Sequence, residues 1–177
     1  TKMSWDWSTA GQRDAQGQQI TRKDAKGRIT YESRKGDFTL AENVKPEYMW
    51  FNGEVKYTLL TDKVEKSGQP TPINRMGGSP TDGKSMIWPM KVFRGKQPYD
   101  PVNKTLITPH TAGNDDTGYW KNLDWDKAVA AGMSEAMQWE LPAPDSVGLM
   151  RFPAGHWREY AQVLAEGAVL AQARLDG

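Results

Sequence analysis

The sequence predicts a mainly α-helical chain with extensive irregular loops and one small β-hairpin. Three observations support this fold class. Apolar residues recur at helical spacing near the C-terminal end, an Asn-Gly pair separates two β-prone runs, and 17 glycines and 11 prolines are spread over the 177 residues. We expect a single domain or subunit over residues 1–177. Its expected parts are an arm (1–47), a hairpin (48–60), a loop-rich segment (61–123) and two helices (124–177).

The first part, residues 1–47, is polar and rich in glycine-containing turns, and we interpret it as an extended arm. Over residues 1–40 the basic side chains outnumber the acidic ones, but both signs are mixed throughout. Mixed charge of this kind is typical of a solvated loop. Within the arm, Ile29-Thr30-Tyr31 indicates a short strand.

The hairpin is predicted over residues 48–60, where Asn52-Gly53 stands between two β-prone runs. Asn-Gly is the strongest short-range hairpin signal, because a type I′ turn needs positive φ at both central residues. After the turn, apolar Val55, Tyr57 and Leu59 alternate with polar residues. This alternation predicts a half-buried strand.

Residues 61–123 predict a loop-rich segment that is ordered by what it lies against. Pro89, Pro98, Pro101 and Pro109 exclude a continuous helix here, because proline lacks the N–H group and clashes with the preceding turn. Buried-type apolar residues lie between these prolines. We therefore expect an irregular but packed crossing.

The last part, residues 124–177, predicts two helices. Between 124 and 137 the apolar positions repeat at helical spacing, and Asp124 is suited to cap the N-terminus. A second helix is expected from about Trp157 to Leu175. Its apolar stripe consists of Tyr160, Val163, Leu164, Ala168 and Ala171.

The composition excludes several classes of protein. The chain has no cysteine, which excludes disulfides, thiol nucleophiles, Cys-ligated zinc and covalent c-type haem attachment by this chain. The formal net charge is +1, which argues against nucleic acid as the main partner. The mean hydropathy is −0.75 and no long apolar run occurs, so we expect no membrane span.

Tryptophan is unusually abundant for so hydrophilic a chain, which contains eight. Each indole offers a large apolar surface with one N–H that needs a partner. These side chains can pack on the chain itself, on a partner or on a planar cofactor. An aromatic-rich extracellular or periplasmic binding module without haem contact is therefore one interpretation of the composition.

Several strings in the chain are similar to the late part of one family. The longest are Trp-Asp-Trp-Ser-Thr-Ala-Gly at 5–11 and Phe-Arg-Gly-Lys-Gln-Pro-Tyr-Asp at 93–100. Shorter strings occur at 50–53, 102–104, 109–111, 118–120 and 124–125. In order and wording, these strings resemble octahaem c-type cytochromes of the tetrathionate-reductase family over roughly residues 1–157.

The resemblance implies a periplasmic or extracellular electron-transfer protein whose helices and loops wrap around stacked haems. Members of that family attach haem through Cys-x-x-Cys-His motifs, and this chain has none. It therefore implies haem c carried covalently by a partner chain or by another segment. The chain would be a subunit or fragment of that cytochrome, in a complex whose oligomeric state stays open. No turnover is expected from it alone.

The two histidines, His110 and His156, are the candidate metal ligands. Each follows a proline closely, and a rigid turn can hold a neutral imidazole nitrogen at the fixed angle that an axial haem ligand requires. Both positions look like histidines of the family, which supports a role as distal axial ligands. The alternative is an ordinary turn histidine hydrogen-bonded to backbone.

Four further residues are candidates for haem contact. Arg94 and Lys96 suit the carboxylates of haem propionates, with surface ion pairs as the alternative. Trp120 and Trp157 lie in or beside the matching strings and can pack on a haem face, with core packing as the alternative. The carboxylates form no convincing acid–base pair, so no catalytic residue is predicted.

Overall fold

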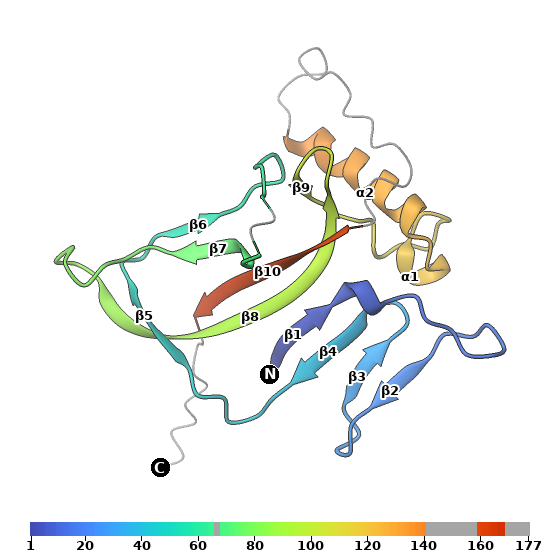
Figure 1. Cartoon of the computed structure of the whole chain (residues 1–177), viewed down its shortest axis with the longest axis horizontal. Coiled ribbons are helices and arrows are strands. Elements are labelled where there is room, and N and C mark those ends of the chain that lie inside the picture. The colour runs from blue at the N-terminus through green and yellow to red at the C-terminus, as the bar shows by residue number, and fades with distance from the viewer. Residues whose placement is uncertain (66–67, 141–158, 169–177) are drawn as a thin grey trace.

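The computed structural model describes residues 1–65, 68–140 and 159–168, and this part of the chain is mainly β (Figure 1). The mainly helical prediction is therefore wrong. The strands are β1 (Lys2–Asp6), β2 (Thr21–Lys23), β3 (Ile29–Glu32), β4 (Gly36–Leu40), β5 (Glu47–Phe51), β6 (Val55–Tyr57), β7 (Thr71–Met76), β8 (Met86–Asp100), β9 (Thr105–Leu106) and β10 (Glu159–Ala168). They form one mixed sheet in the order β2-β3-β4-β1-β8-β10-β7-β6, and β5 and β9 also pair with β8.

The N-terminal residues form an antiparallel group of four strands in the order β2-β3-β4-β1, which we call the meander, rather than an extended arm. The short strand predicted at 29–31 is confirmed as β3. Gly36 opens β4 with φ +81°, and a Cβ there would lie 2.1 Å from the Asp6 carbonyl oxygen. This close approach lets β4 lie beside β1, so a glycine turn that looked solvated is part of the sheet.

The 15-residue strand β8 is the centre of the sheet, where the sequence predicted irregular loop. It pairs in parallel with β1 and antiparallel with β5, β9 and β10. Pro89 pairs with β5 beyond the end of the β10 ladder, which stops at Met90. Pro98 lies beyond the β1 ladder, which covers Arg94 to Lys96. Each proline thus sits where one side of the ladder is interrupted, and a strand tolerates proline there.

The predicted hairpin is also wrong, although both of its strands exist. β5 pairs with β8, and β6 pairs with β7. Gly53 has φ +94°, but Asn52 is not among the residues with positive φ, so the turn is not type I′. The Asn52 N–H donates instead to the Gly77 carbonyl oxygen (2.9 Å). Contacts with β7 and β8 therefore override the local turn signal.

The first predicted helix is confirmed as α2 (Trp125–Glu140), and a short helix α1 (Tyr119–Asn122) precedes it. The Asp124 carboxylate accepts a hydrogen bond from the Lys127 N–H (3.2 Å), as expected of a cap. The second predicted helix is wrong, because Glu159–Ala168 forms β10. All ten residues of β10 pair with β8, and this ladder outweighs the helical spacing.

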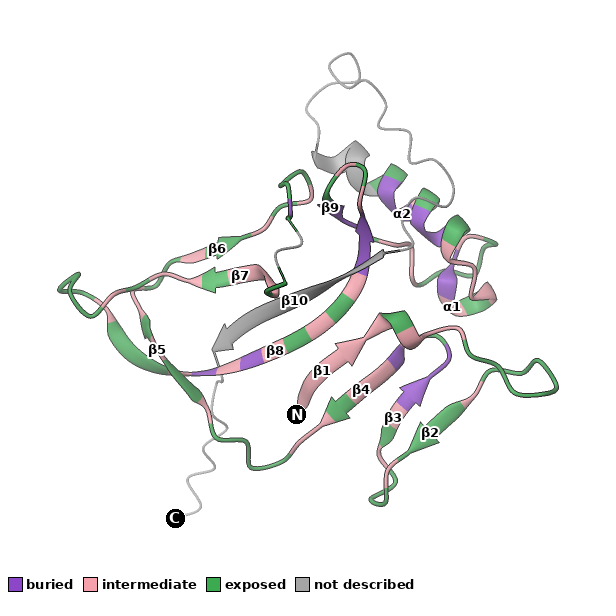
Figure 2. Cartoon of the chain, viewed as in Figure 1, coloured by how far each residue is buried: buried purple, intermediate pink, exposed green. Residues whose placement is uncertain are grey.

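Most buried residues lie in β3, along β8 from Met90 onward, and in the two helices and the loop before them (Figure 2). One cluster joins Val64, Tyr99 and Leu106. A second joins Ile107 to Val129 and Met133 of α2. Within the described residues, neither helix is both long and apolar enough to cross a bilayer.

Candidate functional site

The loop between β9 and α1 places His110 against both helices. The His110 N–H donates to the Ala128 carbonyl oxygen of α2 (2.8 Å), and the His110 carbonyl oxygen accepts from the Tyr119 N–H (3.1 Å). One residue on, the Trp120 N–H donates to the Thr111 carbonyl oxygen (3.0 Å). The backbone thus fixes His110 on two sides and brings it beside Trp120. We call loop 107–118 with α1 and α2 the His110 corner.

Gly132 allows the His110 loop to approach α2 so closely. A Cβ at Gly132 would lie 2.3 Å from the His110 nitrogen and 2.3 Å from the Thr108 carbonyl oxygen. Both are backbone atoms, which cannot rotate away as a side chain would. A glycine inside a helix costs about 1 kcal/mol relative to alanine, so it needs a packing reason, and this contact provides one.

The imidazole of His110 lies between two carboxylates. Its Nδ1 is 3.4 Å from Glu135 Oε2, and its Nε2 is 3.6 Å from Asp115 Oδ2. The side chain is 19% exposed. Nε2 itself is buried and makes no hydrogen bond with any residue that the structure describes. Glu135 thus engages one nitrogen and leaves the other without a hydrogen-bond partner in the described chain.

Asp115 is held by its own loop. Its Oδ1 accepts hydrogen bonds from the Thr117 hydroxyl (2.6 Å), the Thr117 N–H (2.8 Å) and the Gly118 N–H (3.1 Å). The Thr117 hydrogen bonds, with nearby His110, lower the pKa of Asp115 to about 2. Gly113 in the same loop covers the imidazole, because a Cβ there would lie 2.6 Å from Nε2.

His110 is the one candidate metal ligand that the described residues of this corner offer. Among the described residues, no three His, Asp or Glu side chains form a group that could hold a metal ion. Within the described residues, His110 is therefore not part of a ligand set that could hold a metal ion. A histidine whose Nδ1 meets a carboxylate is the usual arrangement for ligation through Nε2.

Trp120, predicted to contact haem, lies beside two cations of the N-terminal meander. The Arg34 guanidinium is 5.6 Å and the Lys35 ammonium 5.9 Å from the centre of its ring. Both cations also pair with Glu32, which is almost fully buried. The Trp120 indole therefore lies near two cations whose charge Glu32 partly neutralises.

A row of aromatic rings holds the meander and the helices together. Trp5 and Trp7 meet edge to face with 5.1 Å between ring centres, and Trp7 lies 5.7 Å from Trp125. Trp125 in turn stacks on Tyr119 at 3.8 Å. Because Tyr119 follows the His110 loop, this row links β1 to the His110 corner.

Arg94 and Lys96 lie on β8, and both form ion pairs with residues outside the His110 corner. Arg94 is 3.8 Å from Glu47 of β5, and Lys96 is 2.8 Å from Asp6 of β1. Both side chains are exposed. His156 and Trp157 lie outside the described residues, so their predicted roles stay predictions.

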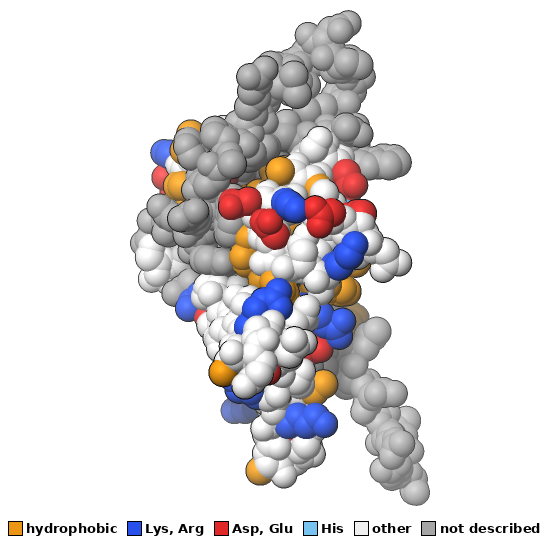
Figure 3. Space-filling view, turned by 90° about the vertical axis from the view of Figure 1, so that its right-hand side faces the viewer, with side chains coloured by type: hydrophobic (Ala, Val, Ile, Leu, Met, Phe, Trp, Pro, Cys, Tyr) orange, Lys and Arg blue, Asp and Glu red, His pale blue; other side chains and the backbone are white. Residues whose placement is uncertain are grey.

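Charge is unevenly distributed near the corner. Figure 3 shows acidic side chains grouped over the helical part of this face and Lys and Arg side chains over the strands beneath. Asp115 and Asp116 belong to the acidic loop, and Lys127 pairs with Asp116. Asp115 faces His110 across this loop, and nothing in the sequence around it indicates that contact.

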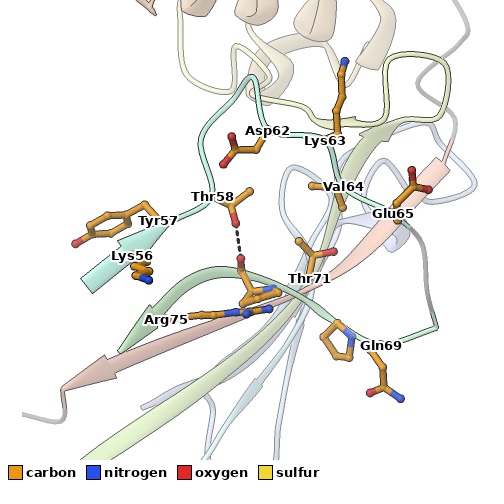
Figure 4. A pocket seen from close by; sticks show the side chains of 12 residues that line it. Lys56, Tyr57, Thr58, Asp62, Lys63, Val64, Glu65, Gln69, Thr71 and Arg75 are labelled. Carbon is orange, nitrogen blue, oxygen red and sulfur yellow. Dashed lines mark hydrogen bonds between the residues drawn. The ribbon is translucent and has the colours of Figure 1, made fainter. Parts of the chain in front are cut away.

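An open pocket of about 600 Å³ lies elsewhere, beside β6 and β7 (Figure 4). Its lining mixes Lys63 and Arg75 with Asp62 and Glu65. The Thr58 hydroxyl donates to the Pro72 carbonyl oxygen (2.6 Å) at its wall. None of the residues predicted as site residues lines it.

The residues missed by sequence reasoning are those that surround His110. Glu135 is 25 positions away and exposed on a helix, so nothing in its local sequence marks it. Arg34 and Lys35 lie in what was interpreted as an arm. Gly132 gave the one usable signal, since a glycine within an amphipathic helix indicates a close contact.

Comparison with known proteins agrees with the resemblance. A family model described as bacterial cytochrome c matches residues 2–150. The solved structure of octahaem cytochrome c from Shewanella oneidensis is 33% identical, with a TM-score of 0.72. The match covers 94% of this chain and 34% of that one, so this chain spans about a third of its length. No curated protein sequence matches the chain.

These matches confirm the predicted relation to octahaem c-type cytochromes. The family model spans most of the described residues, including the His110 corner and the whole of β8. Because of that span and the 33% identity, this chain belongs to the bacterial cytochrome c family.

Proposed function

We propose that this chain packs against haem groups of a periplasmic multihaem c-type cytochrome and that His110 supplies a distal axial ligand to one of them. Since the chain has no cysteine, the haem is attached to a partner chain or to another segment of the same cytochrome. The chain then contributes to electron transfer by its packing and its ligand, and it has no turnover alone.

One observation carries the proposal: Nε2 of His110 is buried and has no hydrogen-bond partner in the described part of the chain. An unsatisfied buried nitrogen is costly, and native proteins rarely leave one without a reason. Ligation by Nε2 satisfies it. The backbone hydrogen bonds of His110 to α1 and α2 fix its main chain, and the contact of Nδ1 with Glu135 orients the ring, as a ligand requires.

Each neighbouring residue then has a distinct role. Glu135 orients the ring through Nδ1 and increases its basicity. Trp120, whose backbone N–H bonds to the residue after His110, offers an apolar face, and Arg34 and Lys35 near its ring provide positive charge for carboxylates. When bound, haem supplies one-electron transfer at its iron. The protein sets the reduction potential of the haem through the axial ligand, the burial of the haem and the charges around it.

The proposal also demands a movement. Gly113 covers Nε2 in the chain described here, with Asp115 alongside. The loop around Gly113 therefore has to shift for Nε2 to reach an iron. Further haem contacts in the proposal are Arg94, Lys96, Trp157 and His156. To bind a haem propionate, Arg94 would have to give up its ion pair with Glu47, and Lys96 its ion pair with Asp6.

The experiment is to purify the native assembly that contains this chain and record its visible and electron paramagnetic resonance spectra. A haem stain of a denaturing gel locates the covalent haem. We expect low-spin haem in the wild-type assembly and a new high-spin signal in His110→Ala, because one iron loses a nitrogen ligand. Glu135→Gln should leave the haem low-spin but shift its reduction potential.

Asp126→Asn, an exposed change on the same helix, is the matched control and should alter neither signal. An assembly without haem on any polypeptide would contradict the proposal as a whole. An unchanged spin state in His110→Ala would remove His110 as a ligand.

A further inference from the structure

A two-stranded ribbon at one end of the sheet exposes apolar side chains in an unusual concentration. It consists of β5 paired with residues 86–90 of β8, and we call it the exposed ribbon (Figure 2). Half of the exposed large hydrophobic side chains in the described part of the chain lie in it. They are Tyr48, Trp50, Met86, Ile87 and Trp88.

Register places several of these side chains on one face. Trp50 pairs directly with Ile87, and Tyr48 pairs with Pro89. Partners in an antiparallel pair lie on the same side of the sheet, and so do residues two apart. Tyr48, Trp50, Ile87 and Pro89 therefore form one continuous face, which we call the Tyr48 face.

The Tyr48 face is open. Tyr48 is 64% exposed and Ile87 58% exposed. On the opposite side of the ribbon, Phe51 and Trp88 pack edge to face with 5.8 Å between ring centres and so cover each other in part. Isolated exposed apolar residues are ordinary, but a contiguous group with Trp and Tyr at its centre is typical of an interface.

The ribbon is held in a fixed shape. The Asn52 N–H donates to the Gly77 carbonyl oxygen (2.9 Å), and the Gly77 N–H donates to the Glu54 carbonyl oxygen (2.8 Å). A Cβ at Gly78 would lie 2.6 Å from the Trp50 carbonyl oxygen, so the loop after β7 lies directly on β5. A rigid apolar surface binds with little loss of conformational entropy.

We infer that the Tyr48 face docks the haem-bearing polypeptide of the cytochrome, which rests on the function proposed above. The chain covers 34% of the octahaem cytochrome that it matches, so about two thirds of that protein lies outside the matched region. This chain has no cysteine, so covalently attached haem would have to be carried by polypeptide outside it. The Tyr48 face is an apolar surface that no described residue covers. The haem-bearing polypeptide is the partner that the proposed function places against this domain.

The test is hydroxyl-radical footprinting of the native haem-bearing assembly. Tyr57 is the internal reference, since it is 66% exposed and of the same residue type as Tyr48. We expect Tyr48 and Trp50 to be oxidised much more slowly than Tyr57. Tyr48 oxidised as fast as Tyr57 would overturn the inference while leaving the haem proposal to its own spectra.

A paired set of variants gives the second measurement. Tyr48→Thr combined with Ile87→Thr keeps strand propensity but removes the apolar face. We expect it to weaken retention of the haem-bearing polypeptide about 30-fold, the loss typical of an interface hot spot. Val102→Thr, equally exposed but beyond the other end of β8, is the control and should retain it fully.

The outcomes separate the two proposals. If the wild-type chain retains a haem-bearing polypeptide and the double variant does so equally well, the docking inference fails and the proposed function stands. If the Tyr48 face is protected by a second copy of this chain, shown by cross-links between identical residues, the inference is likewise wrong. If no haem-bearing polypeptide is found, both fail.

Discussion

The His110 corner and the exposed ribbon lie at opposite ends of β8, and apolar side chains are buried in the first but exposed in the second. At the C-terminal end of β8, Tyr99 packs on Val64 and Leu106, and Ile107 packs on Val129 and Met133. At the N-terminal end, Met86 is 63% exposed, and its neighbours Ile87 and Trp88 are exposed too. One strand thus begins in solvent and ends in the core (Figure 2).

The difference in burial follows from what covers each end of β8. The corner has two helices of its own chain, and Gly132 lets them approach the His110 loop closely. The ribbon has no such cover in the described part of the chain, although its sequence is at least as apolar. Hydrophobicity alone therefore does not distinguish a core from an interface, because both exclude water by the same physical effect.

The largest expected effect tests how tightly the corner is packed. Gly132→Ala places a methyl group against two backbone atoms at 2.3 Å. Because neither the loop nor α2 can yield by rotating a side chain, we expect a loss of about 3 kcal/mol in the free energy of unfolding. Urea denaturation of wild type and variant measures it.

Ala130→Ser, on the exposed side of the same helix, is the control and should cost less than about 0.5 kcal/mol. Equal stability of Gly132→Ala and wild type would mean that the close contact of the loop with α2 does not exist in solution, and the corner would then be no tighter than the ribbon.

A smaller effect compares two positions of β8. Val92 is 3% exposed, so Val92→Thr buries a hydroxyl group and should cost about 1–3 kcal/mol. Ile87→Thr, in the ribbon, should change the stability of the chain by less than about 0.5 kcal/mol, because Ile87 is 58% exposed. Thermal melts of both variants test this, and a large loss from Ile87→Thr would show that the ribbon is covered by the chain itself.

The smallest effect is in the acid limb of the stability profile. Asp115 in the His110 loop and Asp82 near the ribbon both have a pKa of about 2, below the ordinary 3.8, because hydrogen bonds from neighbouring hydroxyl and N–H groups stabilise the carboxylate. A lowered pKa stabilises the folded chain above pH about 4, and this contribution is lost as the pH falls towards 2.

Asp115→Asn and Asp82→Asn should therefore each make stability less steeply dependent on pH between about 4 and 2. NMR separates the two sites, since Asp115→Asn should shift the ring signals of His110 and Asp82→Asn should not. Identical effects of both changes on His110 would contradict the contact between His110 and Asp115.

Local sequence signals succeeded where the chain makes its own contacts nearby. The helix at 124–137 was predicted from its apolar spacing and from Asp124, and both features lie within a few residues of each other. The strand at 29–31 was predicted from a run of neighbouring β-prone residues. Of the candidate site, His110 and Trp120 were each predicted from the family strings, and backbone hydrogen bonds join the loop of the first to the helix of the second.

Local signals failed where distant segments compete. Residues 159–168 have helical spacing, yet they pair along their whole length with β8. Asn52-Gly53 has hairpin chemistry, yet β5 and β6 each pair elsewhere. In both cases a long strand offers hydrogen bonds and packing that exceed the preference of a short segment.

The sequence by itself determined the family, the absence of any cysteine for haem attachment, and the helix that carries Gly132 and Glu135. Only the tertiary structure decided that the chain is a sheet around β8, that Asp115 and Glu135 flank His110, and that Tyr48, Trp50 and Ile87 share an open face. The physical reason is the distance along the chain over which each interaction acts. Capping and amphipathic spacing act within a few residues, whereas strand pairing and burial join segments that are far apart and cannot be read from either one alone.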